Sequence, residues 1–333
     1  MLSAKKKHKR MRGYWRIYHR AHTREATCFR RTLLSTIRRM GAPRSVSKRS
    51  RGRPPVHSWE KLVFLVVFMT YLDCSLRSMQ TLASELKQPW HEPVPDHTTI
   101  YRAMIDIPKW YLEKLLAETV RSCIKASGWD RKKGILASDS TGVETGRYER
   151  AVIAGRKRRK KKHLTLHVVA ILDLMVITAV QVTSNRTKDS PTLRRMVKQM
   201  MRTDLAKEVF GGFFNADKAY DADENCHIIY GLGSQPNIKQ RKTHGKNRGK
   251  RFRRKAAEEF NAIIYRFRGL IEGIFGAYEV KMHGIHTRYR LRQTRKTWGL
   301  LLAISKNIQT YNKLEAAASL GYKRKQISTL LST

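Results

Sequence analysis

Cysteine is scarce in this chain of 333 residues, which has only Cys28, Cys74, Cys123 and Cys226. No two of them have the spacing of a CxxC pair, and no Cys and His residues have zinc-finger spacing. The sequence therefore excludes a disulfide-stapled scaffold, a zinc site and a cysteine nucleophile paired with histidine. We expect the four residues to be free thiols in a reducing cytosol.

Long apolar runs are missing as well. Residues 1–22 are basic throughout and lack the apolar core of a signal peptide, although an Arg-rich, acid-poor start also occurs in organellar transit peptides. The longest apolar stretch, Leu164–Val182, contains His167, Asp173 and Gln181, which predicts two strands rather than a membrane span. Charged residues make up 29% of the chain, and glycine and proline are at ordinary levels. An integral membrane protein, a collagen and a wholly disordered chain are therefore excluded.

Acidic residues are few: 26 Asp and Glu stand against 69 Lys and Arg, for a net charge of +43. The excess lies in four patches, residues 1–53, 147–162, 239–255 and 281–296, with net charges of +17, +8, +10 and +6. The rest of the chain is nearly neutral. A single basic run is as readily a solvated loop as a binding site. Four in one chain predict contact with a polyanion, and nucleic acid is the obvious one.

Composition and periodicity divide the chain into a basic DNA-binding arm, a helical region, an α/β region and a tail. These are residues 1–56, 57–130, 131–310 with basic loops at 147–162 and 241–255, and 311–333. Period-2 patterns predict strands at 134–139, 164–172, 176–184, 212–217 and 236–239, and apolar stripes predict late helices at 256–280 and 296–308. We expect an α/β fold with a mixed five-stranded sheet and flanking helices, preceded by a small all-α domain.

The arm and the helical region each contain a weak DNA-binding signal. Arg51 and Arg53 belong to a stretch that resembles the Arg-Gly-Arg-Pro core of minor-groove hooks, although a Pro-terminated linker explains it equally well. Two apolar helices are followed, after a Pro-containing turn, by a helix capped near Asp96 with Arg102 on its surface. This order is compatible with a helix-turn-helix DNA reader, and a plain helical bundle accounts for it as well.

Three carboxylates stand out by position. Asp139 and Asp217 each end a predicted strand, and Glu272 shares a helix face with Tyr265 and Arg268. Side by side, two strand-end carboxylates would repel unless a cation lay between them. Hard oxygen ligands at one edge suit Mg²⁺, and two such ions stabilise the entering and leaving oxygens of a phosphoryl displacement. Arg268, one turn from Glu272, is placed to hold that carboxylate or to grip a phosphate.

Each of these acids also has an ordinary structural interpretation. A lone Asp at a strand end is often a turn former or a helix cap, and an Arg–Glu pair four apart is usually a surface salt bridge. Among the competing acids, we interpret Asp189 and Asp221 as turn or cap residues and Asp173 as the hairpin turn, whereas Glu144 and Asp223 stay open as ligands. The combination of strand-end acids, a helix-face acid and flanking basic runs favours a catalytic site.

Several stretches resemble the DDE transposases of prokaryotic insertion sequences, in particular the large families four and five. They are Val94–Arg102, Asp139–Gly142, the hairpin region from Lys162 to Ser190, Ala216–Asp221, and Tyr265-x2-Arg268-x3-Glu272, which resembles the Tyr-Arg-Glu-Lys signature. The resemblance implies a ribonuclease-H-like fold. It also implies a catalytic, metal-binding triad of Asp139, Asp217 and Glu272 with two Mg²⁺ ions, for which Mn²⁺ is expected to substitute. The implied reactions are hydrolysis at the element ends and attack of the freed 3′-OH on target DNA.

The resemblance also implies partners and a location. The partners are double-stranded DNA, as terminal inverted repeats and as target, and a second copy of the chain in a homodimer on DNA. No membrane and no small-molecule cofactor are expected, and the location is the prokaryotic cytoplasm, in association with the nucleoid. We expect DNA contacts from Arg51, Arg53, Arg102, Arg156, Lys157, Arg158, Arg159, Lys160, Lys161, Lys162, Lys246, Arg248, Arg251, Arg253 and Arg254.

One position departs from the signature, which expects a basic residue where this chain has Glu279. Lys281 is nearby, but nine residues beyond Glu272 is half a turn round a helix, so Lys281 supports the site only if the helix ends first. The departure keeps open a second hypothesis, a catalytically inactive, sequence-specific DNA-binding protein derived from a transposase. A third, an RNA-binding or ribosome-associated basic protein, has no aromatic-interleaved motif to support it.

Overall fold

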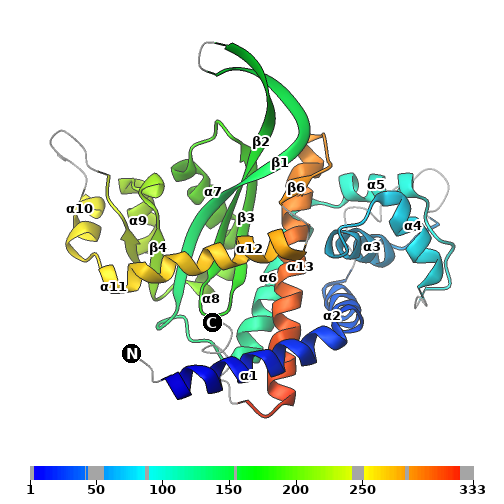
Figure 1. Ribbon diagram of the computed structural model, residues 1–333, viewed down its shortest axis with the longest axis horizontal. Helices are drawn as coiled ribbons and strands as arrows, with labels where there is room; N and C mark the ends of the chain where they lie inside the picture. The colour runs from blue at the N-terminus through cyan, green and yellow to red at the C-terminus, as the bar shows by residue number, and fades with distance from the viewer. Residues whose placement is uncertain are drawn as a thin grey trace.

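The computed structural model shows a mixed α/β sheet domain with a group of helices beside it (Figure 1). It describes residues 4–41, 43, 56–86, 90–153, 156–241, 251–281 and 285–322. Arg51, Arg53, Lys246 and Arg248 lie outside the described residues.

The N-terminal part of the chain is helical: the region 57–130 forms helices, as predicted, and the described part of the basic arm forms two more. Its helices are α1 (Ala4–Thr23), α2 (Glu25–Met40), α3 (Trp59–Tyr71), α4 (Leu76–Glu85), α5 (His97–Asp106) and α6 (Lys109–Ser127). Asp96 caps α5, since its Oδ1 accepts a hydrogen bond from the Thr99 backbone N–H at 2.6 Å. The connection between α4 and α5 is longer than the turn of about three or four residues typical of a helix-turn-helix. The DNA-reading role of α5 stays a prediction.

The sheet has the strand order β3-β2-β1-β4-β5, with a short strand β6 paired to β1. The strands are β1 (Ile135–Ile153), β2 (Arg156–Ile171), β3 (Val176–Ser184), β4 (Phe213–Ala216), β5 (Gln235–Ile238) and β6 (His286–Thr287). β2 is antiparallel to both of its neighbours, whereas β4 and β5 continue the sheet in parallel with β1. The predicted mixed sheet of five strands and its ribonuclease-H-like order are confirmed, with β6 as a sixth strand.

Residues 147–153 and 156–162 of the basic segment, which was predicted to be a loop, are part of the sheet instead. After an irregularity between Glu144 and Tyr148, β1 stays paired to β2 from Tyr148 opposite Lys161 to Ile153 opposite Arg156. The hairpin extends beyond the rest of the sheet (Figure 1). A two-stranded ribbon outside the core does not need alternating apolar residues, so its sequence lacks the usual strand pattern.

Helices cover both faces of the sheet. On one face, α6 and α13 (Arg292–Ser319) pack with Leu166, Val168 and Val180. A side chain at Gly299 of α13 would come within 2.5 Å of Val182, so glycine allows this helix to approach the sheet closely. On the other face, α7 (Asp189–Arg202) packs with Val169 and Ile171. The predicted last helix, 296–308, is thus the middle of a longer one that enters the predicted tail.

The remaining helices lie between and after the parallel strands. They are α8 (Leu205–Val209), η2 (Lys218–Tyr220), α9 (Asp223–Gly231), α10 (Arg251–Glu258), α11 (Ala262–Tyr265), η3 (Arg266–Ile271) and α12 (Glu272–Lys281). The prediction of one helix over 256–280 was wrong, because α10 ends and Asn261 caps a new start. Its predicted core stripe is correct only in part: Ile271 and Ile274 are buried, whereas Ile263 is 70% and Phe267 44% exposed.

In the described part of the chain, no single helix has the length and apolar character of a membrane span; only α3 and α4 taken together, at 115° to each other, reach that threshold.

Candidate active site

Two of the predicted acids lie at neighbouring positions on parallel strands. Ser138 of β1 is paired with Ala216, the last residue of β4. The next residue on each strand is an aspartate, Asp139 on β1 and Asp217 after β4. The prediction that Asp139 ends its strand was wrong, because β1 runs on to Ile153. Asp139 and Asp217, which are far apart in sequence, therefore occupy neighbouring positions at the C-terminal end of the short strand β4.

Arg268 holds Asp139 directly. Its Nη1 donates to Asp139 Oδ2 at 2.7 Å, and the backbone N–H of Ser140 donates to Oδ1 at 2.8 Å. The two side chains are 23% and 19% exposed, so the pair lies at the surface of the site. The ring of Tyr265 lies 5.9 Å from the Arg268 guanidinium. The predicted helix face that carries Tyr265 and Arg268 does meet the first strand acid.

The pKa of Asp139 reports on the balance of negative and positive charge around it. Burial raises the pKa of Asp139, and the charges of Asp217 and Glu272 raise it further. The hydrogen bond from Ser140 and the positive charge of Arg268 oppose this rise in pKa. Asp217 and Glu272 therefore both lie within electrostatic reach of Asp139, and the charge of Arg268 opposes theirs.

A network of three asparagines, of which Asn215 and Asn237 are buried, fixes the segment that carries Arg268 and Glu272 to the sheet. Asn237 Nδ2 of β5 donates to Asn215 Oδ1 of β4 at 2.9 Å and to the backbone carbonyl of Asn261 at 3.0 Å. Asn261 in turn donates its backbone N–H to Asn237 Oδ1 at 2.9 Å and caps α11 with its side chain. Asn215 Nδ2 donates to the carbonyl of Ile264 at 2.8 Å. None of the three residues was predicted from the sequence.

Asp189 also belongs to this site, although it was interpreted as a turn or cap residue. It is the first residue of α7, and Lys188 is the N-cap residue of that helix. Its Oδ1 accepts from the Ser140 hydroxyl at 3.5 Å and lies 3.3 Å from His167 Nδ1. Burial raises the pKa of Asp189, and the charge of Asp217 adds to the rise. The signal that points to it is the resemblance at Lys162–Ser190, where an aspartate follows the hairpin.

Other acids have structural roles. Asp173 Oδ2 accepts hydrogen bonds from Trp129 Nε1 and from the Ile135 backbone N–H, each at 3.0 Å, and so supports the hairpin turn as predicted. Asp221 binds Arg253 through both carboxylate oxygens at 2.7 Å, with side chains that are 2% and 5% exposed. The prediction that Arg253 contacts DNA is therefore corrected: the residue is buried in an ion pair.

The residues fit a divalent cation by chemistry, but they do not form a ready ligand shell. Among the described residues, no three His, Cys, Asp or Glu side chains lie close enough together to hold a metal ion. In favour of a cation are the hard carboxylate oxygens, the raised pKa of Asp139 and a buried polar atom without a hydrogen-bond partner, Tyr220 Oη. Arg268 stands where part of that positive charge would otherwise be needed.

The other predicted site residues are placed as follows. Arg102, Arg251 and Arg254 are exposed. Residues 156–162, which include the remaining predicted contacts, form the N-terminal half of β2, and the structure describes their backbone only. Helix α12 is continuous from Glu272 to Lys281, so the half-turn between these two positions is kept.

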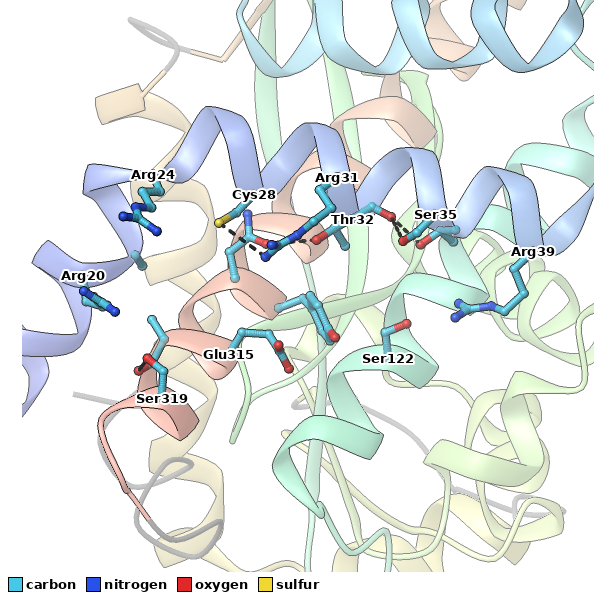
Figure 2. Close-up of a pocket in the computed structure, with 15 residues that line it drawn as sticks. Arg20, Arg24, Cys28, Arg31, Thr32, Ser35, Arg39, Ser122, Glu315 and Ser319 are labelled. Carbon is cyan, nitrogen blue, oxygen red and sulfur yellow. Dashed lines mark hydrogen bonds between the residues drawn. The ribbon is translucent and has the colours of Figure 1, made fainter. Parts of the chain in front are cut away.

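Residues of α1, α2, α6 and α13 line a cationic pocket of about 610 Å³ (Figure 2). Arg20, Arg24, Arg31 and Arg39 line it from one side, and Glu315 of α13 lines it from the other. Arg39 also lies 3.7 Å from Glu118. Glu315 and Glu118 therefore balance part of the positive charge of this pocket.

The chain belongs to the transposase DDE domain family, which matches residues 130–308. It is similar to the Mos1 strand transfer complex at 11% identity, over 84% of this chain and 82% of that chain, with a TM-score of 0.29. Similarity to the Mos1 paired-end complex with left transposon end is 13% identity over 71% and 82% of the two chains, at a TM-score of 0.24. A Mos1 mariner paired-end complex with Mn is similar at 13% identity over 72% and 83%, at 0.22. No curated protein sequence matches the chain.

Proposed function

We propose that this member of the transposase DDE domain family cuts DNA at the ends of an insertion sequence and joins the freed 3′-OH to target DNA. The observation that carries the proposal is the position of Asp139 and Asp217, each next to the paired residues Ser138 and Ala216, with Arg268 on Asp139. The asparagine network supports it, because it ties the segment with Glu272 to the same strands. Carboxylates brought together from separate elements are what phosphoryl transfer with metal ions requires.

In this proposal Asp139, Asp217 and Glu272 hold divalent ions, Mg²⁺ or in its place Mn²⁺, two to a site. When bound, such ions lower the pKa of a water and stabilise charge on the phosphate oxygens. Arg268 holds Asp139 in the absence of DNA, and it binds a phosphate once the divalent ions are bound to the acids. Tyr265 orients Arg268. Exposed Arg102, Arg251 and Arg254, the β1–β2 hairpin and the N-terminal arm bind the DNA backbone.

The test uses the whole chain, Mg²⁺ and a duplex that carries the inverted repeats flanking its own gene. We expect nicking and joining by the unmodified protein and a loss of roughly a thousandfold or more in Asp139→Asn, Asp217→Asn and Glu272→Gln, with DNA binding retained. Asp204→Asn and Glu224→Gln are matched controls, since these carboxylates are 76% and 65% exposed and lie outside the site. Unimpaired cleavage by the three site variants would remove the triad from the proposal.

A second candidate is a catalytically inactive DNA-binding protein derived from a transposase. Two observations favour it: exposed Glu279 stands where a basic residue is expected, and no three-ligand group is assembled among the described residues. The role proposed for Lys281 is also weakened by the continuous α12. Salt-sensitive binding to the inverted repeats without cleavage in Mg²⁺ or Mn²⁺ would select this candidate.

We further propose that two copies of the chain assemble on DNA and that the protein resides with the nucleoid in a prokaryotic cytoplasm. The mass of the protein–DNA complex, measured by light scattering with and without the inverted repeats, tests the assembly. A complex with one chain per pair of DNA ends contradicts the homodimer.

A further inference from the structure

A groove of about 650 Å³ runs along the outer strand β3. β3 is an edge strand of the sheet, and its residues Gln181–Ser184 line the groove. Three helices supply its walls: α7, the start of α6 and the start of α13. We call this feature the β3-edge groove. Its cationic lining residues are Lys109, Arg195, Lys198, Arg202, Arg292, Arg295 and Lys296.

No acid lines the β3-edge groove, and only part of its positive charge is paired. Buried Glu113 binds Lys109 at 3.1 Å and Arg202 at 2.9 Å. Arg295 donates to the Tyr289 carbonyl at 2.9 Å. Within the part of the chain that the structure describes, the four remaining cations of the α7 and α13 walls have no carboxylate partner; they are Arg195, Lys198, Arg292 and Lys296. Four unpaired cations around one hollow form a site for an anion with several charges.

The electrostatics of Lys296 are consistent with this. Burial lowers the pKa of the Lys296 ammonium, and the positive charges of Arg292, Lys109 and Arg195 lower it further. Like charges held together in this way repel, and a bound phosphate would relieve the repulsion. The pocket in Figure 2 differs, because Glu315 lines it and Glu118 pairs with Arg39.

A direct side-chain contact connects the β3-edge groove to the candidate active site. His167 of β2 lies with Nε2 at 2.9 Å from the hydroxyl of Thr183, a groove residue. Its Nδ1 lies 3.3 Å from Asp189, next to the acids. Burial lowers the pKa of His167 to about 4, with Arg195 adding to the effect, so the ring is neutral at pH 7. One buried ring therefore connects Thr183, which lines the groove, to Asp189 beside the acids.

We propose that the β3-edge groove binds the phosphodiester backbone of the duplex on which the candidate active site acts. This inference rests on the proposed function for the identity of the duplex. Contacts to phosphate from Lys, Arg, Ser, Thr and Gln position a protein on DNA without reading sequence. The groove combines these residue types on one surface, and they do not discriminate between bases. It fixes how far the duplex extends past the acids.

The test measures how the affinity for duplex DNA depends on salt. Each phosphate contact contributes about −0.9 to the slope of log K against log salt. The groove variant carries Arg195→Gln, Lys198→Gln, Arg292→Gln and Lys296→Gln. We expect its slope to be smaller in magnitude by about 2 to 4, with a melting temperature close to that of the unmodified chain. The matched control removes the same charge at exposed lysines away from the groove: Lys125→Gln, Lys132→Gln, Lys133→Gln and Lys207→Gln.

The outcomes separate the groove from the chemistry. Equal slopes for the groove variant and the control overturn the inference. Full competition by inorganic phosphate at constant ionic strength also overturns it, because it shows a site for a single free phosphate. Asp139→Asn should keep the full slope. A groove-dependent slope without any cleavage leaves the inference standing and removes the proposed chemistry, whereas cleavage with a groove-independent slope does the reverse.

Discussion

Two arginine–aspartate pairs in this protein have the same closest distance and different surroundings. Arg253 and Asp221 form two bonds of 2.7 Å, and their side chains are 5% and 2% exposed. Arg268 and Asp139 form one bond of 2.7 Å, and their side chains are 23% and 19% exposed. The first pair is buried and uses both carboxylate oxygens, so it holds α10 against the segment after β4. The second uses one oxygen beside two further acids, so it can be exchanged.

The difference shows that contact distance alone does not separate a structural ion pair from a functional one. Burial of both partners makes the first pair costly to break, because either charge left alone would be desolvated. At Asp139 the neighbours Asp217 and Glu272 compete for the same arginine, and the pKa of Asp139 is raised by burial and by their charges despite the bond. A pair of this kind fits a site that binds cations or phosphate in turn.

The largest effect on stability is expected at the buried pair. Arg253→Ala leaves the Asp221 carboxylate buried without its partner, and we expect the free energy of unfolding to fall by about 3–5 kcal/mol. Urea unfolding followed by circular dichroism measures it. Exposed Arg254 is the matched control, and Arg254→Ala should stay within about 0.5 kcal/mol of the unmodified chain. Similar values for the two variants would show that burial does not distinguish the pairs.

A smaller loss is expected in the asparagine network beside the Arg268 pair. Asn237→Ala removes the donor to Asn215 Oδ1 and to the Asn261 carbonyl, and the acceptor for the Asn261 N–H. Leaving such buried groups unpaired costs about 1–3 kcal/mol. Because Asn261 starts the segment with Arg268, DNA cleavage should fall further than stability predicts. Lys239→Ala, at an exposed position just after β5, should leave the free energy of unfolding unchanged.

The exposed pair should matter little for stability and strongly for activity. Arg268→Ala breaks a partly exposed ion pair, so we expect a loss of at most about 1 kcal/mol in the free energy of unfolding. DNA cleavage should fall roughly tenfold to a hundredfold, as expected when a positioning contact is lost. Exposed Arg266, in the same segment, gives the control variant Arg266→Ala. A loss of stability as large as that of Arg253→Ala would contradict the comparison.

The sequence predicted one of these pairs in part and mispredicted the other. Asp139 and Asp217 were recognisable because each follows apolar strand residues, and Arg268 because it shares a helix face with Tyr265. The burial of Arg253 was not recognisable, since it stands in a run of basic residues that looks uniformly solvated; its partner Asp221 is distant in sequence. The asparagines have no periodic signal either. Their role depends on the pairing of β4 with β5, which local pattern does not determine.

A third kind of aspartate sharpens the comparison and gives the smallest expected effect. Backbone and hydroxyl donors, rather than an arginine, hold the Asp96 carboxylate. Its pKa is lowered from 3.8 to about 2, chiefly by the Thr99 backbone N–H and then by side-chain hydrogen bonds from Thr99 and Thr98. Because the folded pKa lies below the unfolded value, the stabilisation is present above about pH 4 and is lost as the pH falls toward 2. Its sign is opposite to that at Asp139, whose pKa is raised.

Melting temperatures between pH 5 and pH 2 measure this effect. Asp96→Asn keeps a capping oxygen but has no charge to titrate, so the variant should lose part of the decline that the unmodified chain shows in acid. Asp106→Asn is the control: it removes one carboxylate charge at the other end of α5 and leaves the Asp96 cap unchanged. Identical acid profiles for Asp96→Asn and the unmodified chain would mean that backbone N–H groups do not hold this carboxylate as firmly as the structure indicates. An arginine partner would then be the more effective of the two ways in which this fold stabilises an aspartate.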